Sequence, residues 1–369
     1  MKTTGIQAYP LSVQFQRPQV TSQSAYRKVS ICLVRIDTDE GIYGVGESLA
    51  RFGAQAYAAL IEGLLAPTLI GQDPLSVTKH WDTMRNTLNG RSGGILFEAI
   101  AGIDIALWDI RGKALNAPIW MLLGGKVRDR VPVYASSIMV DSDIHAAADR
   151  IIAAGFRNLK LKCGGDIDAE IARIAKLRKY IGPEYGIMVD ANYIFSEYQA
   201  LRFAELAAEH HILWFEEPIQ PENRRGYCRL SRKSPIALAA GESEFTAHDC
   251  TDLFVEGAVQ FIQPDISRCG GITECQRVAV AADAFGIQYA PHVGFSGVVC
   301  VAASLHLAAA SRNLAFQECM ITPNALREEL AVNPYGLYTQ VQDGTVAIPE
   351  GPGLGIEIDW NAVERLWDR

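Results

Sequence analysis

IMVDAN (187–192) and LWFEEP (213–218) share one pattern, a short apolar run followed by an acidic residue. LAAGES (238–243) and FIQPDI (261–266) repeat it further along the chain. Polar residues end such runs at intervals of 23 to 28 positions: Ser136, Lys162, Asp190, Glu216, Glu242, Asp265, His292 and Glu318. A strand, a helix and two loops occupy about that length, so eight such units predict a closed parallel (β/α)8 barrel.

The ends of these strands indicate where the functional site lies. In such a barrel the C-terminal ends of all strands open on one mouth, so the eight polar side chains are predicted to converge there. Residues 1–125 lack the period and contain three β-rich runs and several helical stretches. We therefore expect an α+β domain over 1–125, the barrel over 126–325, and a C-terminal segment over 326–369 that returns to the first domain.

Composition excludes several classes of protein. The chain has 369 residues, a hydrophobic fraction of 49% and a net charge of −8. The negative charge disfavours nucleic acid as a partner, and no apolar run reaches the roughly 20 residues that span a bilayer. The sequence shows no signal peptide, so we expect a cytoplasmic protein. Its eight cysteines include no CxxC pair and are expected to be reduced thiols.

Three carboxylates form the first candidate site. Asp190, Glu216 and Glu242 end three successive predicted strands. Neighbouring carboxylates repel one another unless a cation lies between them. Oxygen ligands without a thiolate or imidazole favour Mg2+ over Zn2+. The alternative is that each acid only caps the helix after its strand. That alternative explains a single acid better than it explains three acids at the same position of successive units.

Candidate acid and base residues flank these carboxylates. Lys160 and Lys162 lie two apart on a predicted strand and share one face. Repulsion between them is expected to lower one pKa, which suits a general base, although an ordinary pair of solvated lysines is the alternative. Asp265 and His292 end adjacent strands, and the carboxylate would hold the imidazole as a general acid or base. Glu318 would donate a hydrogen bond to an oxyanion if burial keeps it protonated; otherwise it forms a salt bridge.

The motifs resemble those of the enolase superfamily, mandelate racemase-like subgroup, over almost the whole chain. They are GIDIALWDIRGK (102–113), KLK (160–162), VDAN (189–192), WFEEP (214–218), GES (241–243), QPDISRCGG (263–271), PHVGFSG (291–297) and GPGLGIEI (351–358). The resemblance implies a modified (β/α)7β barrel with an α+β capping domain built from the N-terminal region and the C-terminal tail. It implies that the three carboxylates bind Mg2+. Lys162, assisted by Lys160, would be the base on one face of the substrate, and the Asp265–His292 pair would act on the other.

The resemblance also implies a reaction. Members of this family remove the proton α to a carboxylate and form an enediolate, which a divalent cation stabilises. Elimination then gives a dehydratase, reprotonation a racemase or epimerase, and ring opening a cycloisomerase. We expect dehydration of a hydroxylated or sugar acid, as in acid-sugar dehydratases. A racemase or epimerase, or a cycloisomerase similar to the galactarolactone cycloisomerases, is the alternative.

Substrate contacts are expected in two loops of the capping domain, Gln14–Tyr26 and Leu49–Gln55. Their polar composition suits a hydroxylated acid, whose second carboxylate would meet an arginine. The assigned contacts are Arg17, Arg51, Ser136 and Asn192, with the alternative that both arginines are solvated.

Two readings from other classes stay open. A noncatalytic sugar-acid-binding barrel would bind metal without exchanging an α-proton. A metal-dependent hydrolase barrel favours an HxH pair after the first barrel strand, and VYASS (133–137) lacks it. For the enzyme we expect a homo-oligomer, from dimer to octamer, that acts on a small carboxylate without nucleic acid or membrane partners.

Overall fold

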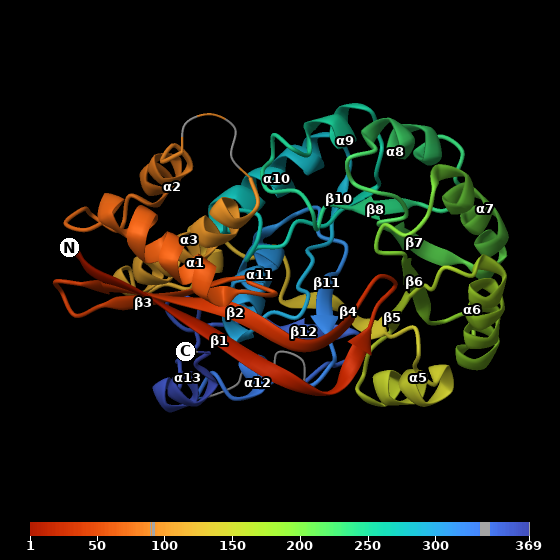
Figure 1. Cartoon of the computed structure of the whole chain (residues 1–369), viewed down its shortest axis with the longest axis horizontal. Helices are drawn as coiled ribbons and strands as arrows, with labels where there is room; N and C mark the ends of the chain where they lie inside the picture. The colour runs from red at the N-terminus through yellow and green to blue at the C-terminus, as the bar shows by residue number, and fades with distance from the viewer. Residues whose placement is uncertain (89, 91–92, 333–339, 369) are drawn as a thin grey trace.

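The structure is a computed structural model that describes residues 1–88, 90, 93–332 and 340–368. It contains an antiparallel sheet on one side and a larger, mainly parallel sheet on the other (Figure 1). The antiparallel sheet has the order β1-β2-β3. Its strands are β1 (Thr3–Val20), β2 (Ala25–Thr38) and β3 (Tyr43–Ser48). We call this sheet and the helices packed on it the cap.

The cap sheet packs against one long buried helix. The cap helices are α1 (Ala54–Leu60), continued by a π-helical turn (Ile61–Leu65) and a 3-10 turn (Ala66–Thr68), then α2 (Val77–Arg85), α3 (Ile95–Ala114) and α4 (Ile119–Leu122). Helix α3 is apolar on most sides, as a helix enclosed by the protein must be. A Cβ atom on Gly46 of β3 would lie 1.8 Å from the carbonyl oxygen of Gly102 in α3. Glycine is therefore required where these two backbones meet.

Within the described residues, eight parallel strands form the barrel. They are β4 (Arg130–Ile138), β5 (Asn158–Lys162), β6 (Gly186–Asp190), β7 (Ile212–Glu216), β8 (Leu238–Ala240), β9 (Phe261–Ile262), β10 (Gln288–Tyr289) and β11 (Gln317–Met320). The hydrogen-bonded order runs β10-β9-β8-β7-β6-β5-β4-β11. A parallel bridge between Tyr289 and Leu314 joins its two ends.

Helices connect these strands and cover the outside of the barrel (Figure 1). They are α5 (Ile144–Ala153), α6 (Ile167–Ile181), α7 (Glu197–Ala207) with a 3-10 turn (Ala208–His210), α8 (Arg224–Ser231), α9 (Thr251–Val255), α10 (Ile272–Ala284) and α11 (Val298–Ala310). Each connection carries an α-helix, which gives the (β/α)7β order. The predicted modified barrel with a separate α+β cap is confirmed.

An apolar layer fills the barrel beneath its mouth. Tyr134, Met188, Trp214, Ala239 and Ala290 form a buried cluster of their own, and the rings of Tyr134 and Trp214 meet edge to face at 5.2 Å. Side chains two apart on a strand share a face. The polar residues two positions beyond Tyr134, Met188, Trp214 and Ala290 therefore also point inward, one layer nearer the mouth: Ser136, Asp190, Glu216 and His292.

The C-terminal segment contacts both parts of the molecule. After α12 (Ala325–Glu328), strand β12 (Thr345–Ala347) pairs antiparallel with β4 of the barrel. Helix α13 (Trp360–Leu366) then packs against β1 of the cap, where Trp367 bridges to Leu11. The two labelled chain ends accordingly lie on the same side of the molecule in Figure 1. No helix in the described part of the chain has the length and apolar character to cross a bilayer.

Candidate active site

The barrel mouth gathers the polar strand ends beneath a hairpin of the cap. The turn between β1 and β2 lands on the mouth, where the Ser22 hydroxyl donates to the carbonyl of Cys163 and the Gln23 amide donates to the carbonyl of Asn192. The backbone N–H of Val140 donates to Val20 at 3.3 Å. All eight strand-end residues are buried there. The cap therefore shields these charged groups from bulk water.

The two lysines of β5 lie among the carboxylates. Lys160 Nζ is 2.5 Å from Glu216 Oε1 and 2.8 Å from Glu318 Oε1. Lys162 forms a salt bridge with Asp190, whose other oxygen accepts the backbone N–H of Asn192 at 2.9 Å. The pairing is direct because β5 neighbours β6 and their residues are in register from 158 to 162.

The lysine charges contradict one expectation. We expect repulsion to lower the pKa of one lysine. In the structure the attraction of the carboxylates raises the pKa of both lysines and outweighs burial and this repulsion. Glu216 and Glu318 raise the pKa of Lys160 well above its usual value against the effect of burial. Asp190 likewise raises the pKa of Lys162, although burial and Lys160 both oppose it. Both lysines are therefore held as ammonium ions in this arrangement.

On the other side of the carboxylates, His292 lies between two acids. Its Nδ1 is 2.7 Å from Asp265 Oδ2, and its Nε2 is 2.9 Å from Glu242 Oε2. Burial opposes protonation, yet Glu242 and Glu318 raise the pKa of His292 to about 10. Asp265 also accepts from the backbone and hydroxyl of Ser267, so the carboxylate is fixed on both oxygens. The predicted Asp265–His292 pair is therefore present as a hydrogen-bonded unit.

Glu318 is a salt-bridge partner and not a protonated donor. Burial alone would raise its pKa, but Lys160 and His292 lower it to about 2, with a hydrogen bond from Ser136 adding to the effect. Its Oε2 accepts the backbone N–H of Val293 at 2.7 Å. Of the two alternatives for Glu318, the salt bridge agrees with this structure and the protonated donor does not, because the neighbouring cations outweigh burial. Ser136 contacts Glu318 and, at 2.7 Å, the hydroxyl of Ser137.

The three carboxylates suit a hard cation by their chemistry. Asp190, Glu216 and Glu242 lie at or just beyond the ends of neighbouring strands, are buried, and offer only oxygen donors. Lys160 already shows that a positive group fits between two of them, since its Nζ is 3.6 Å from Asp190 and 2.5 Å from Glu216. In their present conformations, however, no three acidic, histidine or cysteine side chains of the described residues converge with metal-site geometry, and this includes the three carboxylates. Binding a cation therefore requires these carboxylates to turn away from their present partners.

Sequence reasoning did not single out Tyr193, which contacts the same acids. The tyrosine hydroxyl hydrogen-bonds Glu242 and lies 2.9 Å from the Ser243 hydroxyl. Tyr193 has a positive φ of 67°, uncommon for a tyrosine, and this conformation turns the residue into the mouth. Glu217, which also has a positive φ, is buried and accepts from the Tyr227 hydroxyl at 2.6 Å. Nothing in the strand period marks either residue, because both lie in loops.

The four expected substrate contacts occupy different environments. Ser136 is buried in the cluster described above. Asn192 lies at the mouth, where its side-chain oxygen is buried and, within the described structure, accepts no hydrogen bond. Burial opposes the charge of Arg51, but Glu242 and Tyr193 raise its pKa, which places the guanidinium beside the cluster. Arg17 is exposed, and no described contact joins its side chain to the mouth.

The loops expected to give a polar wall also carry aromatic rings. Phe15 and Tyr26 of the cap hairpin pack against Phe295, which follows His292 by three residues, and Phe52 of the second loop stacks on Tyr26. The ring centroids are 5.2 Å apart for Phe15 and Phe295, 5.5 Å for Tyr26 and Phe295, and 5.8 Å for Tyr26 and Phe52. Composition alone hid this cluster because the rings are scattered among polar neighbours in the sequence. The entrance is therefore partly apolar, contrary to the expectation.

A closed α/β barrel with buried carboxylates, lysines and an Asp–His pair at one mouth is the architecture of an acid–base enzyme. Family comparison is consistent with this class. Residues 143–362 match the family described as enolase C-terminal domain-like, and residues 5–124 match the mandelate racemase / muconate lactonizing enzyme N-terminal domain. The chain belongs to the enolase superfamily.

Its relatives include both a lyase and isomerases. D-galactarolactone cycloisomerase of Agrobacterium fabrum is 34% identical, with 98% of each chain covered. D-galactonate dehydratase of Xanthomonas oryzae pv. oryzae is 34% identical, with 90% of each covered. Among solved structures, the 3,6-anhydro-D-galactonate cycloisomerase from Zobellia galactanivorans has a TM-score of 0.91 at 31% identity, covering 100% of both chains. A racemase from Streptomyces coelicolor A3(2) with bound magnesium has a TM-score of 0.91 at 28% identity, covering 99% of both.

Proposed function

We propose that this chain is a Mg2+-dependent enzyme that removes the proton α to the carboxylate of a hydroxylated sugar acid and then eliminates water. One observation carries the proposal. Lys162 and His292, the two candidate bases, contact the two ends of one arc of carboxylates, Asp190 at the end of β6 and Glu242 just after β8. A substrate carboxylate bound within that arc would present its α-carbon between the two bases.

In this mechanism each of these residues has a separate role. Lys162 takes the α-proton on one face, and Lys160 supplies a fixed positive charge beside the developing negative charge. His292, oriented by Asp265, donates a proton to the leaving hydroxyl on the other face. The hairpin over the mouth limits water near the reacting carbon.

A Mg2+ ion would be held by Asp190, Glu216 and Glu242. When bound, it would take up the carboxylate charge that now keeps the lysines protonated and would offset the second negative charge on the substrate carboxylate. Three protein ligands would leave coordination positions of such an ion for the substrate. The solved racemase with bound magnesium supports the choice of ion.

Two groups at the mouth support a polyhydroxylated substrate. The unpartnered, buried side-chain oxygen of Asn192 accepts a hydrogen bond from a substrate hydroxyl, since a buried acceptor left without a donor is costly. Arg51 has no hydrogen bond or ion pair with any other described residue, and it offers a guanidinium to a second acidic or hydroxyl group. The names of the galactonate and galactarolactone relatives agree with such a substrate.

The test is incubation of the purified protein with sugar acids and their lactones in D2O with Mg2+. We expect deuterium at the α-carbon and a 2-keto acid as the product. Deuterium uptake with inversion and no keto acid would identify a racemase or epimerase instead. Metal binding without any exchange of the α-proton would indicate a noncatalytic binding protein.

Lactone ring opening is the second candidate function. It is favoured by the cycloisomerase relatives, whose alignments cover 98% and 100% of this chain. The aromatic cluster at the entrance also suits the C–H face of a ring. In the same assay, consumption of a lactone without consumption of the open acid would favour ring opening.

A homo-oligomeric state and a cytoplasmic location also stay predictions. Light scattering tests the oligomeric state.

A further inference from the structure

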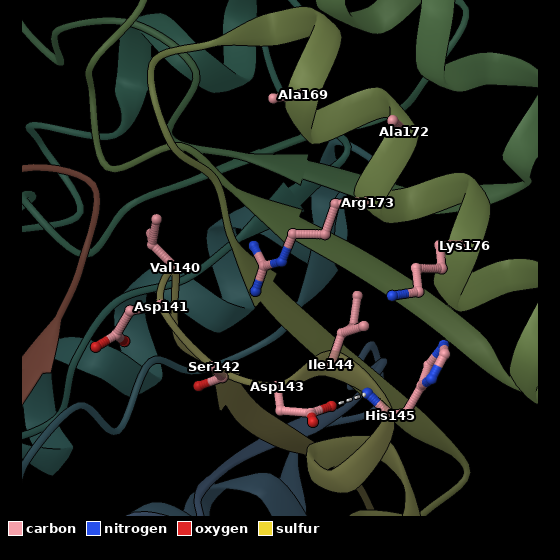
Figure 2. Close-up of a pocket in the computed structure, with 10 residues that line it drawn as sticks. All are labelled: Val140, Asp141, Ser142, Asp143, Ile144, His145, Ala169, Ala172, Arg173 and Lys176. Carbon is pink, nitrogen blue, oxygen red and sulfur yellow. Dashed lines mark hydrogen bonds between the residues drawn. The ribbon is translucent and has the colours of Figure 1, made fainter.

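A groove lies on the outer side of the mouth, between the loop after β4 and helix α6 (Figure 2). Its volume is about 670 Å3, and it is lined by residues 140–145 and by four residues of α6: Ala169, Ala172, Arg173 and Lys176. Figure 2 shows the Arg173 side chain extending from α6 toward the loop on the opposite side. Only 14% of that side chain is exposed, so its guanidinium is enclosed by what it contacts.

The guanidinium of Arg173 joins two strand ends. Its Nη1 donates to the carbonyl of Lys162 at 2.9 Å, and its Nη2 donates to the carbonyl of Met139 at 2.7 Å. Glu170, one turn earlier on α6, accepts from Nη1 at 3.1 Å and holds the fork in place. Arg173 thus fixes the backbone of the candidate base Lys162 relative to the end of β4, without touching the mouth itself.

The cap hairpin contacts the residues next to these two carbonyls. Val140, which follows Met139, donates to Val20 of β1, and Cys163, which follows Lys162, accepts from Ser22. One side chain therefore holds together the two backbone segments on which the hairpin rests. A shift of either segment would move both Lys162 and the hairpin contacts.

We propose that Arg173 is a positioning residue that couples the seating of the cap hairpin to the placement of Lys162. The inference rests on the proposed function, in which Lys162 removes the α-proton. A planar guanidinium can bridge two carbonyls in fixed directions, whereas the single ammonium of a lysine cannot reproduce that geometry. The purely structural alternative is that Arg173 only stabilises helix α6 against the barrel.

Arg178 on the same helix provides a matched control. It also donates to backbone carbonyls, to Gly182 at 2.8 Å, Tyr185 at 2.7 Å and His210 at 3.0 Å. These carbonyls precede β6 and β7, at the end of the barrel away from the mouth. A loss that comes only from loosening α6 would therefore appear equally in Arg173→Lys and Arg178→Lys.

The experiment compares both lysine variants with the wild type. For Arg173→Lys we expect kcat to fall by about tenfold to a hundredfold with a smaller change in KM, and faster backbone hydrogen exchange in residues 14–26. Arg178→Lys should keep kcat and hairpin exchange near wild type. Equal losses in the two variants, or an unchanged Arg173→Lys protein, would overturn the proposal. Backbone amide exchange can be measured without turnover, so it tests the coupling by itself. A wild type that does not exchange the substrate α-proton would refute the proposed function and leave the amide-exchange comparison intact.

A second variant gives an independent check. In Arg173→Ala the groove leaves the two carbonyls accessible, so added guanidinium ion should restore part of kcat. Urea, which is planar but uncharged, should restore less. The absence of rescue by guanidinium, or equal rescue by urea, would argue against a bridging guanidinium.

Discussion

Nδ1 of His292 lies 2.7 Å from Oδ2 of Asp265, at the ends of adjacent strands. The other oxygen of the Asp265 carboxylate is held by Ser267, so the carboxylate cannot turn away without losing two hydrogen bonds. The imidazole is thereby fixed with Nε2 directed to the carboxylate arc. This pair gives the most direct test of the acid–base assignment.

Asp265→Asn should lower kcat on the order of a hundredfold, because an amide neither orients the imidazole nor stabilises its charge in the same way. The measurement is steady-state turnover of a sugar acid identified by the D2O screen. Asp283→Asn is the control, since Asp283 forms an exposed ion pair with Arg312. Equal activity of wild type and Asp265→Asn would remove the pair from the mechanism.

His292→Asn should abolish net conversion and still exchange the α-proton, whereas Lys162→Ala should lose both conversion and exchange. Their contacts with Asp190 and Glu242 place them at opposite ends of the arc, so the base that faces the α-proton survives only in His292→Asn. Proton NMR in D2O measures the exchange and identifies the stereochemistry of the labelled product. Wild-type turnover in both variants would show that Lys162 is not the base and His292 is not the acid.

Mg2+ should raise the melting temperature of the wild type, because an ion that binds only the folded state stabilises it by mass action. EDTA should abolish turnover, and Mg2+ should restore it. In Glu216→Gln the shift with Mg2+ should shrink, whereas Glu244→Gln, which removes a buried acid paired with Arg224, should keep the full shift. Full turnover in metal-free protein would contradict the assignment of the carboxylates.

His306 predicts loss of stability in acid. Burial lowers its pKa to about 4 from the usual 6.5, and its Nδ1 accepts the backbone N–H of Trp120 at 3.2 Å. The unfolded chain binds the proton on this histidine more tightly than the folded chain does. The contribution of neutral His306 to the free energy of unfolding is therefore fully present above pH 6.5 and is lost as the pH falls toward 4. The loss is about 3 kcal/mol. Urea unfolding at several pH values measures it.

The control for that prediction is His211, which is exposed. His306→Gln should flatten the dependence between pH 6.5 and 4, and His211→Asn should leave it unchanged. A wild type equally stable at pH 7 and pH 4.5 would show that the His306 pKa is not depressed.

Gly46→Ala should destabilise the cap by about 1–3 kcal/mol or abolish its folding, because the added methyl meets the backbone of α3. Gly63→Ala is the matched change, since a Cβ there meets nothing within 4 Å. The second variant should be neutral or slightly stabilising through its less flexible unfolded chain. Thermal unfolding compares the two, and equal melting temperatures would contradict the close packing of β3 on α3.

The sequence predicts the barrel because its strand ends are separated by regular intervals and because a strand directs alternate residues inward. Asp190 and Glu216 could be placed at the mouth on that basis alone. The charge state of Lys162 and Glu318 could not be predicted, since it depends on which side chains face each other inside the barrel. Tyr193 was missed because its position follows from a positive φ in a loop, which no hydrophobic period records.

The contact between Leu11 and Trp367 joins residues 356 positions apart in the chain. Strand β1 is synthesised before the barrel, yet the surface that covers it, with Trp360 and Trp367 against Tyr9, is synthesised only after the whole barrel. During translation the apolar edge of β1 therefore stays uncovered while more than 300 further residues are added. A nascent chain that stops short of residue 360 therefore exposes an apolar surface of the kind that chaperones bind.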